Sequence, residues 1–264
     1  MKAEWVAFDT ETTGVEPGSR LVELGAVAFA ADGTTVATFS SLVHPGMPMP
    51  PDATAVSGLS ERMLASAPPA AEVLREFLAW LPSQARLVAH NAQFDQDILG
   101  WELDRAGLAW PSQRVVDSCL LARVLGETAN NRLQTIIAHH GWEVAGEGHR
   151  ALPDADAVRR LLLHALGRGL DRSLFTGQPF TSTARYPRRL PRNLAVLPEA
   201  IATGKRIATV YTDRGGVTTE REVTPLGYAQ RKDVLQWHGW CHLREQRRTF
   251  LAEGTVRTSL AVAS

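Results

Sequence analysis

The sequence predicts an α/β fold, a mixed β-sheet flanked by helices, followed by a small C-terminal β-barrel. Three strand-like segments separated by short turns occupy residues 5–43, and strands alternate with helices from residue 86 onward. Antiparallel strands followed by alternating strands and helices are typical of a mixed sheet with helices packed against it. Beyond residue 198, four short strand-like segments separated by turns predict the barrel.

The first three strands are expected from apolar runs bounded by turn residues. The first, 5–8, is apolar throughout and leads into Asp9 and Glu11, and Gly14 marks the turn that follows. Segments 20–29 and 35–43 complete an antiparallel meander, with Gly33 in the turn between them.

The later elements follow from helical spacing and capping residues. Segment 70–81 places apolar residues on one helix face, and Pro82 ends it. Asn91 is a candidate cap for a helix that contains Phe94, and Asp117 is read first as a cap. The remaining expected elements are strands 86–90 and 115–116 and helices 131–140 and 152–166.

Composition restricts the class of protein. The chain has 264 residues, 44% of them hydrophobic, which is enough for one large or two smaller cores. No apolar run has the length of a membrane span and the N-terminus has no signal-peptide pattern, so a cytoplasmic protein without membrane contacts is expected. The distant cysteines Cys119 and Cys241 favour a reducing compartment.

The charges are unevenly distributed and indicate two domains. Residues 1–184 contain 14 Lys and Arg against 21 Asp and Glu, whereas residues 185–264 contain 14 against 7. A basic C-terminal part suggests a module that attracts polyanions, although basic surfaces are often only solvated. We expect one domain over 1–168, an Arg-, Pro- and Gly-rich linker over 169–198, and a β domain over 199–264.

Two carboxylates at the end of the first strand are the starting point for function. Asp9 and Glu11 lie two residues apart, so on a strand they point to the same face. Two ionised acids beside an apolar strand repel each other unless a cation neutralises them. Taken alone, the pair could equally be two solvated residues before a turn.

Further acids at the ends of predicted elements decide between these interpretations. Asp95 falls in the first turn of one helix, and Asp154 falls in another, five residues after His149. Four carboxylates with a histidine suit two Mg²⁺ or Mn²⁺ ions about 4 Å apart, because hard cations take oxygen ligands. His149 alone would be read as a solvated loop residue.

These segments resemble the three motifs of the DEDDh, or DnaQ-like, 3′-5′ exonucleases. Asp9 and Glu11 match the first motif, Asp95 the second, and His149 with Asp154 the third; the likeness covers roughly residues 4–168. It implies a ribonuclease H-like fold in which Asp9 bridges two metal ions and the other three carboxylates complete their ligands. His149 would be the general base, because histidine can take up a proton near neutral pH.

The resemblance also indicates residues near the substrate. Thr12 and Thr13 match positions beside the terminal nucleotide. Phe94 could stack on a base, although its spacing with Ile98 favours core packing, and Asn91 is a substrate contact or a helix cap.

The C-terminal segment resembles a WYL domain, an Sm/SH3-like barrel thought to sense nucleic acid or nucleotide ligands. Lys205-Arg206 and Cys241 to Phe250 contribute to the likeness, and Leu235-Gln236-Trp237 occupies the place of the Trp-Tyr-Leu triplet. An anion-binding cluster is expected, with Trp237 or Trp240 as a stacking surface; the alternative is a core of aromatics with solvated arginines. The expected members are Tyr211, Arg221, Arg244 and Arg248.

The leading hypothesis is a metal-dependent 3′-5′ exonuclease that releases nucleoside 5′-monophosphates from single-stranded DNA ends, in proofreading or repair. RNA is an alternative substrate, because the same residues serve both. A regulator whose exonuclease fold only recognises ends is an alternative of another class. A DNA polymerase or a nucleotide are further expected partners of the C-terminal domain.

Overall fold

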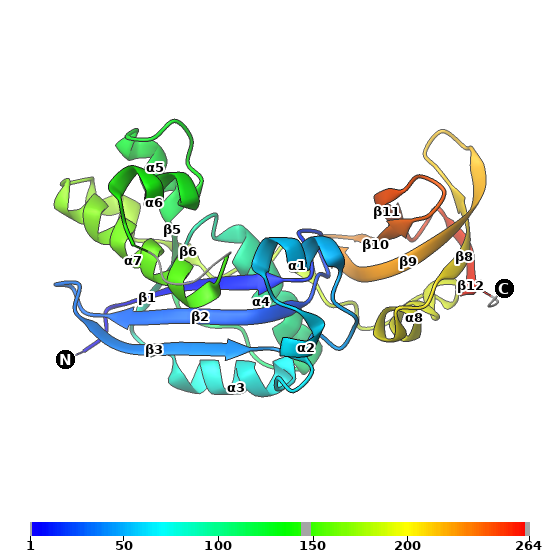
Figure 1. The fold of residues 1–264 in the computed structure, drawn as a ribbon, viewed down its shortest axis with the longest axis horizontal. Coiled ribbons are helices and arrows are strands. Elements are labelled where there is room, and N and C mark those ends of the chain that lie inside the picture. The colour runs from blue at the N-terminus through cyan, green and yellow to red at the C-terminus, as the bar shows by residue number, and fades with distance from the viewer. Residues whose placement is uncertain (1, 144–148, 262–264) are drawn as a thin grey trace.

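The computed structural model describes residues 2–143 and 149–261. They form two lobes along the long axis of the molecule, an N-terminal sheet with helices on both faces and a C-terminal sheet beside it (Figure 1). Within these residues, no helix combines the length and the apolarity needed to cross a bilayer.

The N-terminal sheet is mixed, as the sequence predicts. Its strand order is β3-β2-β1-β4-β5-β6, in which β1, β2 and β3 pair antiparallel, β1, β4 and β5 pair parallel, and β6 returns antiparallel. The short β6 comes from the predicted linker. The strands are β1 (Trp5–Thr12), β2 (Leu21–Phe29), β3 (Thr35–Leu42), β4 (Arg86–Ala89), β5 (Arg114–Asp117) and β6 (Gln178–Pro179).

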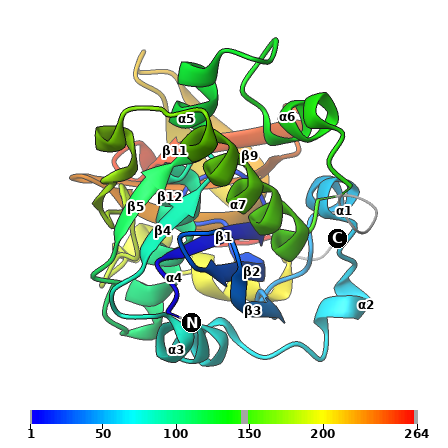
Figure 2. The ribbon, with the colours of Figure 1, turned by 90° about the vertical axis from the view of Figure 1, so that its left-hand side faces the viewer.

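Helices cover both faces of this sheet (Figure 2). On one face α3 and α4 enclose a core that includes Phe8 and Phe77, and on the other α5 and α7 enclose a core that includes Ala7 and Leu162. The helices are α1 (Pro51–Ser57), α2 (Glu61–Leu64), α3 (Ala70–Trp80), α4 (Gln93–Ala106), α5 (Ser118–Leu125), α6 (Leu133–His140) and α7 (Ala151–Gly167).

Most predicted elements are found, and the differences have local causes. The helix predicted over 70–81 ends at Trp80, and the strand predicted over 86–90 ends at Ala89. Asp117 caps α5 as predicted, accepting a hydrogen bond from the Cys119 amide. Asn91 does not cap α4, because the N-cap position is Ala92 and Asn91 adopts a left-handed conformation with φ 58°.

The C-terminal lobe is a second sheet with strand order β11-β10-β9-β8-β12, to which β7 adds beside β9. Its core contains the buried Trp237 and Phe250, whose rings stack with centroids 4.3 Å apart. The remaining elements are η1 (Arg172–Phe175), β7 (Ala184–Arg185), η2 (Arg192–Leu194), α8 (Leu197–Thr203), β8 (Ile207–Thr212), β9 (Thr218–Arg231), β10 (Val234–Cys241), β11 (Gln246–Leu251) and β12 (Thr255–Leu260).

The predicted Sm/SH3-like barrel is not closed. Strands β11 and β12 lie at opposite ends of the strand order, and no hydrogen-bonded register joins them within the described residues. The apolar face is covered by other means, because Leu194 of η2 and Leu197 and Ile201 of α8 pack into the same core as Trp237. Sequence periodicity gives strand positions, but it does not say whether a helix or a further strand pairing covers the face.

The two lobes meet where α4 approaches β9. The indole of Trp101 donates a hydrogen bond to the Tyr228 carbonyl at 3.0 Å and packs edge-on against Tyr186, with ring centroids 5.2 Å apart. Gly18, in the loop after β1, also lies against this strand, because a Cβ there would overlap the backbone of Tyr228. The N-terminal lobe is therefore fixed to the C-terminal lobe by packed, buried groups.

Gly25 permits the close approach of α7 to β2, so Gly25→Ala is expected to reduce stability. A Cβ at this position would overlap the backbone of Ala151 and Leu152, which rigid main chain cannot avoid. Overpacking of this kind costs about 1–3 kcal/mol. Urea unfolding measures the loss, and Gly167→Ala is the control because no atom lies within 4 Å of its Cβ. Equal midpoints for the two variants would contradict this interpretation.

Candidate active site

The end of β1 directs side chains to both faces of the N-terminal sheet. Ala7 packs on the α7 side and Phe8 on the α4 side, so strand alternation places Asp9 and Glu11 toward α7 and Thr10 toward α4. Glu11 is buried. The two carboxylates that the sequence places on one face are therefore directed at the helix that carries Asp154.

An ion pair holds the start of α7 against the sheet. Glu23 on β2, directly opposite Glu11, accepts hydrogen bonds from Arg150 Nε at 3.0 Å and Arg150 Nη2 at 2.7 Å. The same carboxylate accepts the Ala151 amide at 3.0 Å, one of the free N–H groups at the start of the helix. This contact sets α7 so that Asp154, in its first turn, lies beside Glu11.

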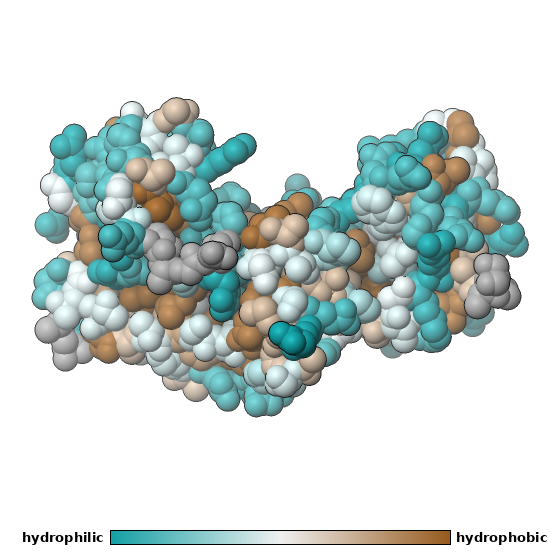
Figure 3. Space-filling view, viewed as in Figure 1, coloured by the Kyte–Doolittle hydropathy of each residue, from teal (hydrophilic) through white to brown (hydrophobic). Residues whose placement is uncertain are grey.

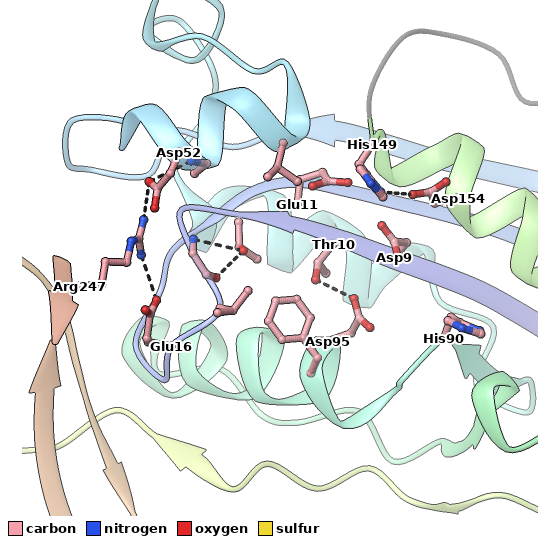
Figure 4. Close-up of a pocket in the computed structure, with 16 residues that line it drawn as sticks. Asp9, Thr10, Glu11, Glu16, Asp52, His90, Asp95, His149, Asp154 and Arg247 are labelled. Atoms are coloured by element: carbon pink, nitrogen blue, oxygen red, sulfur yellow. Dashed lines mark hydrogen bonds and ion pairs between the residues drawn. The ribbon is translucent and has the colours of Figure 1, made fainter. Parts of the chain in front are cut away.

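The fourth carboxylate arrives from the opposite face. Asp95, in the first turn of α4, is buried and accepts a hydrogen bond from the Thr10 hydroxyl at 2.7 Å. Thr10 therefore ties the α4 side of β1 to the site, while Asp9 and Glu11 face the α7 side. All four predicted carboxylates line one pocket of ≈ 370 Å³ (Figure 4).

His149 lies at the edge of this pocket beside Asp154. Its Nδ1 atom is 3.3 Å from Asp154 Oδ2, and nearly half of its side chain, 46%, is exposed. Gln134 of α6 donates to Asp154 Oδ1 at 3.3 Å and approaches His149 Nδ1 at 3.5 Å. The structure thus brings His149 together with Glu11 and Asp154, with one ligand atom of each within 4.8 Å of the others.

Burial raises the pKa values of all four acids, and repulsion within the set adds to the increase for Asp9 and Glu11. Desolvation is the main cause for each, and it raises the pKa of Glu11 to about 8 and that of Asp95 to about 7. For Asp9 the neighbouring Asp95, Asp154 and Glu11 add to the increase in pKa. The pKa of Asp154 is also raised, although His149 opposes the shift.

This donor set fits divalent cations. The four acids supply carboxylate oxygens on one pocket, and no arginine or lysine of the described residues forms an ion pair with any of them. Hard divalent cations prefer oxygen ligands of this kind. The same charge that raises the carboxylate pKa values would be neutralised by such ions.

His90 lines the pocket, and both of its ring nitrogens are engaged in hydrogen bonds. Its Nε2 atom lies 2.6 Å from the Asn131 carbonyl oxygen and must donate, so Nδ1 accepts from the Ser118 hydroxyl at 2.9 Å. Burial lowers the pKa of this imidazole. His90 is therefore held as a neutral side chain that joins β4 to α5 and the loop before α6.

The mouth of the pocket combines apolar side chains with one arginine from the other lobe. Val15 and Val56 are 78% and 57% exposed and line the pocket with Phe94, which also packs against the α3 and α4 core. Apolar residues over α1 border the hollow between the lobes (Figure 3). Arg247 of β11 reaches this mouth from the C-terminal sheet.

Arg247 bridges three groups of the N-terminal lobe. Its guanidinium donates to Glu16 at 2.9 Å, to Asp52 at 2.7 Å and to the Thr13 carbonyl at 3.2 Å. These contacts fix the loop after β1 and the start of α1 at the rim of the carboxylate pocket (Figure 4).

Of the other residues predicted to contact substrate, one lines the pocket and two lie outside its lining. Thr12 lines the pocket, and its hydroxyl donates to the Gly14 carbonyl at 2.7 Å. Thr13 is buried outside the lining, where its hydroxyl accepts the Arg20 amide. Asn91 is exposed and also lies outside the lining, with its amide donating to Asp117.

The predicted anion cluster of the C-terminal lobe is only partly assembled. Phe250 contacts Tyr211 edge-on at 5.2 Å and lies 6.0 Å from the Arg221 guanidinium, whose Nε donates to Thr219. Arg244 and Arg248 are exposed, and their side chains form no hydrogen bond or ion pair with the described residues. Trp237 is fully buried, which leaves Trp240, 40% exposed, as the aromatic surface.

Sequence reasoning missed four residues that organise the site: Thr10, Glu23, Gln134 and Arg247. Thr10 lies between the two predicted acids, and Arg150, the partner of Glu23, lies next to His149, so these positions in the sequence were a signal. Gln134 and Arg247 gave none, because only the packing of α6 and of the second lobe brings them near.

Comparison with known proteins identifies the families that the two parts of the chain match. The family described as Exonuclease (RNase_T) matches residues 6–162, and the WYL domain family matches residues 192–253. The chain belongs to this exonuclease family, the DnaQ-like 3′-5′ exonucleases, and carries a WYL domain match at its C-terminus.

Particular relatives share the N-terminal part. The DNA polymerase III subunit epsilon-like protein of Rhodobacter capsulatus is 39% identical over 179 residues, 64% of this chain but only 25% of that protein. The DNA polymerase III subunit epsilon of Treponema pallidum is 35% identical over 161 residues, 60% of this chain and 74% of that protein. Exonuclease X, in complex with 5′ overhanging duplex DNA, superimposes with a TM-score of 0.53 at 26% identity, over 65% of this chain and 97% of that one.

Because the carboxyl groups are crowded and buried, we expect the free energy of unfolding of the metal-free protein to decrease as pH rises. The pKa of Glu11 in the folded state is about 8, above its ordinary value, so the folded state binds more protons than the unfolded state between these two pH values. The contribution of Glu11 to the free energy of unfolding is fully present below its ordinary pKa. It decreases as pH rises toward 8, by about 1.4 kcal/mol per pH unit for each extra proton that the folded state binds.

Urea unfolding in EDTA between pH 5 and 8 measures this effect. Mg²⁺ should restore stability most at the upper end, and Glu11→Gln should flatten the decline because it removes one titrating acid. Stability that stays constant or rises across this range in EDTA would show that the carboxylates are not electrostatically strained.

Proposed function

We propose that this chain is a metal-dependent 3′-5′ exonuclease that hydrolyses DNA from its 3′ end to nucleoside 5′-monophosphates. The observation that supports it most is the meeting of Asp9, Glu11, Asp95 and Asp154 with His149 in one pocket. The complex of Exonuclease X with duplex DNA supports DNA as the substrate.

In this proposal Asp9, Glu11, Asp95 and Asp154 would hold two Mg²⁺ or Mn²⁺ ions. The bound cations would offset the charge of the scissile phosphate and of the leaving 3′-oxygen. The carboxylates remain ionised in that state, and Thr10 keeps Asp95 oriented through its hydroxyl.

His149 acts as the general base that takes a proton from the attacking water. Its Nδ1 faces Asp154 Oδ2 at 3.3 Å, so a proton on Nδ1 is shared with that carboxylate. Nε2 then carries the free lone pair, and it has no partner among the described residues. Asp154 thereby sets the tautomer that a general base needs.

The mouth of the pocket binds the terminal nucleoside. Val15, Val56 and Phe94 offer apolar surface to the base and sugar, and Thr12 lines the same pocket. The groove next to it, ≈ 580 Å³, shares Asp52 and Arg247 with the pocket and is bordered by Trp240. In the proposal it receives the preceding nucleotides, with Trp240 as a stacking surface.

We assign nuclease chemistry to residues 1–168 and added grip on nucleic acid, or nucleotide sensing, to residues 199–264. A polymerase partner is suggested by the names of the relatives alone. The segment 169–198 joins the two parts and adds β6 to the first sheet and β7 to the second.

Digestion of 5′-labelled single-stranded DNA and RNA of the same sequence tests the function. With Mg²⁺ or Mn²⁺ we expect a ladder of products shortened from the 3′ end, faster for DNA. Asp9→Ala should lower the rate by at least about 10²–10³-fold, because it removes charge at the centre of the site.

Three outcomes of this assay separate the alternatives. Faster shortening of RNA would favour the exoribonuclease. Tight DNA binding without cleavage would favour the end-recognising regulator. Equal activity of Asp9→Ala and the unchanged protein would refute the proposed site.

Arg247→Ala is expected to lower kcat/KM on an oligonucleotide by roughly 10–100-fold, because the loop after β1 and the start of α1 lose their common anchor. Arg248→Ala is the matched control, since it removes the same charge from the neighbouring exposed position. Similar losses in both variants would mean that overall charge, and not the anchor, determines the rate.

A further inference from the structure

A second group of potential metal ligands lies among the helices of the N-terminal lobe. Glu127 follows α5, His140 is the last residue of α6, and His164 lies in the last turns of α7. One ligand atom of each lies within 4.8 Å of the other two, and none of the three lines the carboxylate pocket. Three elements distant in sequence therefore present metal-binding groups at one point.

The distances fit a small tetrahedral ion. Glu127 Oε2 lies 2.8 Å from His164 Nε2 and 3.7 Å from His140 Nε2. Bonds of about 2.0–2.1 Å in a tetrahedral site place neighbouring ligand atoms roughly 3.3 Å apart. The two observed distances lie on either side of that value. Shifts of about half an ångström would therefore bring both pairs of ligand atoms to the separation that a tetrahedral ion requires.

The surroundings leave the required atoms available. Arg168 contacts the other carboxylate oxygen, Glu127 Oε1, at 3.3 Å, so Oε2 faces only the two imidazoles. The ring of His140 stacks on Trp142, with centroids 4.7 Å apart and planes 15° apart, which fixes its direction. The three side chains are 16–28% exposed, which leaves a path for the ion and a position for water.

The protonation states also suit metal binding. Burial, followed by the neighbouring His164 and His139, lowers the pKa of His140, so its imidazole is readily neutral. A hydrogen bond from His164 lowers the pKa of Glu127, so this carboxylate is anionic. Neutral imidazole and ionised carboxylate are the forms that bind metal, and an ion would displace the proton now shared by His164 and Glu127.

The ligand types identify the class of metal. Two imidazole nitrogens and one carboxylate suit Zn²⁺ and related transition metals, whereas Mg²⁺ prefers oxygen ligands. We propose that Glu127, His140 and His164 form a zinc-binding site, with water as the fourth ligand, that joins the end of α6 to the end of α7.

The position of the site gives it a structural role. α6 also carries Gln134, which donates to Asp154 of α7. His140 is six residues from Gln134, about 9 Å along the helix, and His164 is ten residues from Asp154, about 15 Å. The ion would hold the two helices together at one end, while Gln134 and Asp154 hold them at the other.

Zinc titration of chelator-treated protein in saturating Mg²⁺ tests the proposal. Mg²⁺ occupies oxygen sites, so Zn²⁺ should then raise the Tm by about 5 °C at 100-fold excess over its Kd. His140→Ala and Glu127→Gln should abolish this shift. His139→Ala is the matched control, because this adjacent exposed histidine is outside the cluster and should keep it.

Cobalt absorption provides a second measurement that does not depend on how the variants fold. In the unchanged protein with saturating Mg²⁺, one equivalent of Co²⁺ should give the visible bands of a four-coordinate nitrogen and oxygen site, without the near-ultraviolet band of thiolate ligation. No such bands, or a zinc-dependent Tm shift of equal size in His140→Ala and His139→Ala, would overturn the proposal.

Discussion

Crowding of four carboxyl groups at the end of β1 is the constraint on which the rest of the structure depends. Desolvation raises the pKa values of Asp9, Glu11, Asp95 and Asp154, with repulsion from the other acids adding to it for Asp9 and Glu11, so the bare cluster opposes folding whenever these groups ionise. Both cores of the N-terminal lobe adjoin this strand, and α4 and α7 each deliver one acid to its end. Packing energy thus holds the acids where cations would stabilise them.

Elsewhere the chain pairs the acids that it buries. Glu23 is held by Arg150 and the Ala151 amide, and Glu102 accepts a hydrogen bond from Arg20 Nε at 2.6 Å. Removing one partner of such a pair leaves an uncompensated buried charge, which is strongly destabilising. Glu23 and Glu11 lie opposite each other on adjacent strands, but of the two only Glu23 forms an ion pair with an arginine in the described residues. Unpaired acids here are therefore a feature of the pocket and not of the whole lobe.

Sequence patterns predicted the parts of the site that depend on local geometry. Strand alternation placed Asp9 and Glu11 on one face, and helical starts placed Asp95 and Asp154 in first turns. Patterns failed where a contact depends on packing between distant segments. Asn91 was predicted as a helix cap, but the helix begins two residues later and the backbone of Asn91 adopts a left-handed conformation. The barrel was inferred from strand periodicity, which contains no information on whether edge strands meet or α8 covers the core.

Arg247 connects the state of the second lobe to the mouth of the pocket. Its three polar contacts all go to the N-terminal lobe, at the loop after β1 and at the start of α1. The burial of its guanidinium between Glu16 and Asp52 means that moving β11 away would leave two carboxylates unpaired at the rim. Linkage is reciprocal, so if the position of β11 affects the affinity of the pocket for substrate, a ligand that shifts β11 and the substrate would change each other's affinity by the same factor. The position of β11 is therefore part of the rim of the pocket under either proposed role of the C-terminal lobe, grip on nucleic acid or nucleotide sensing.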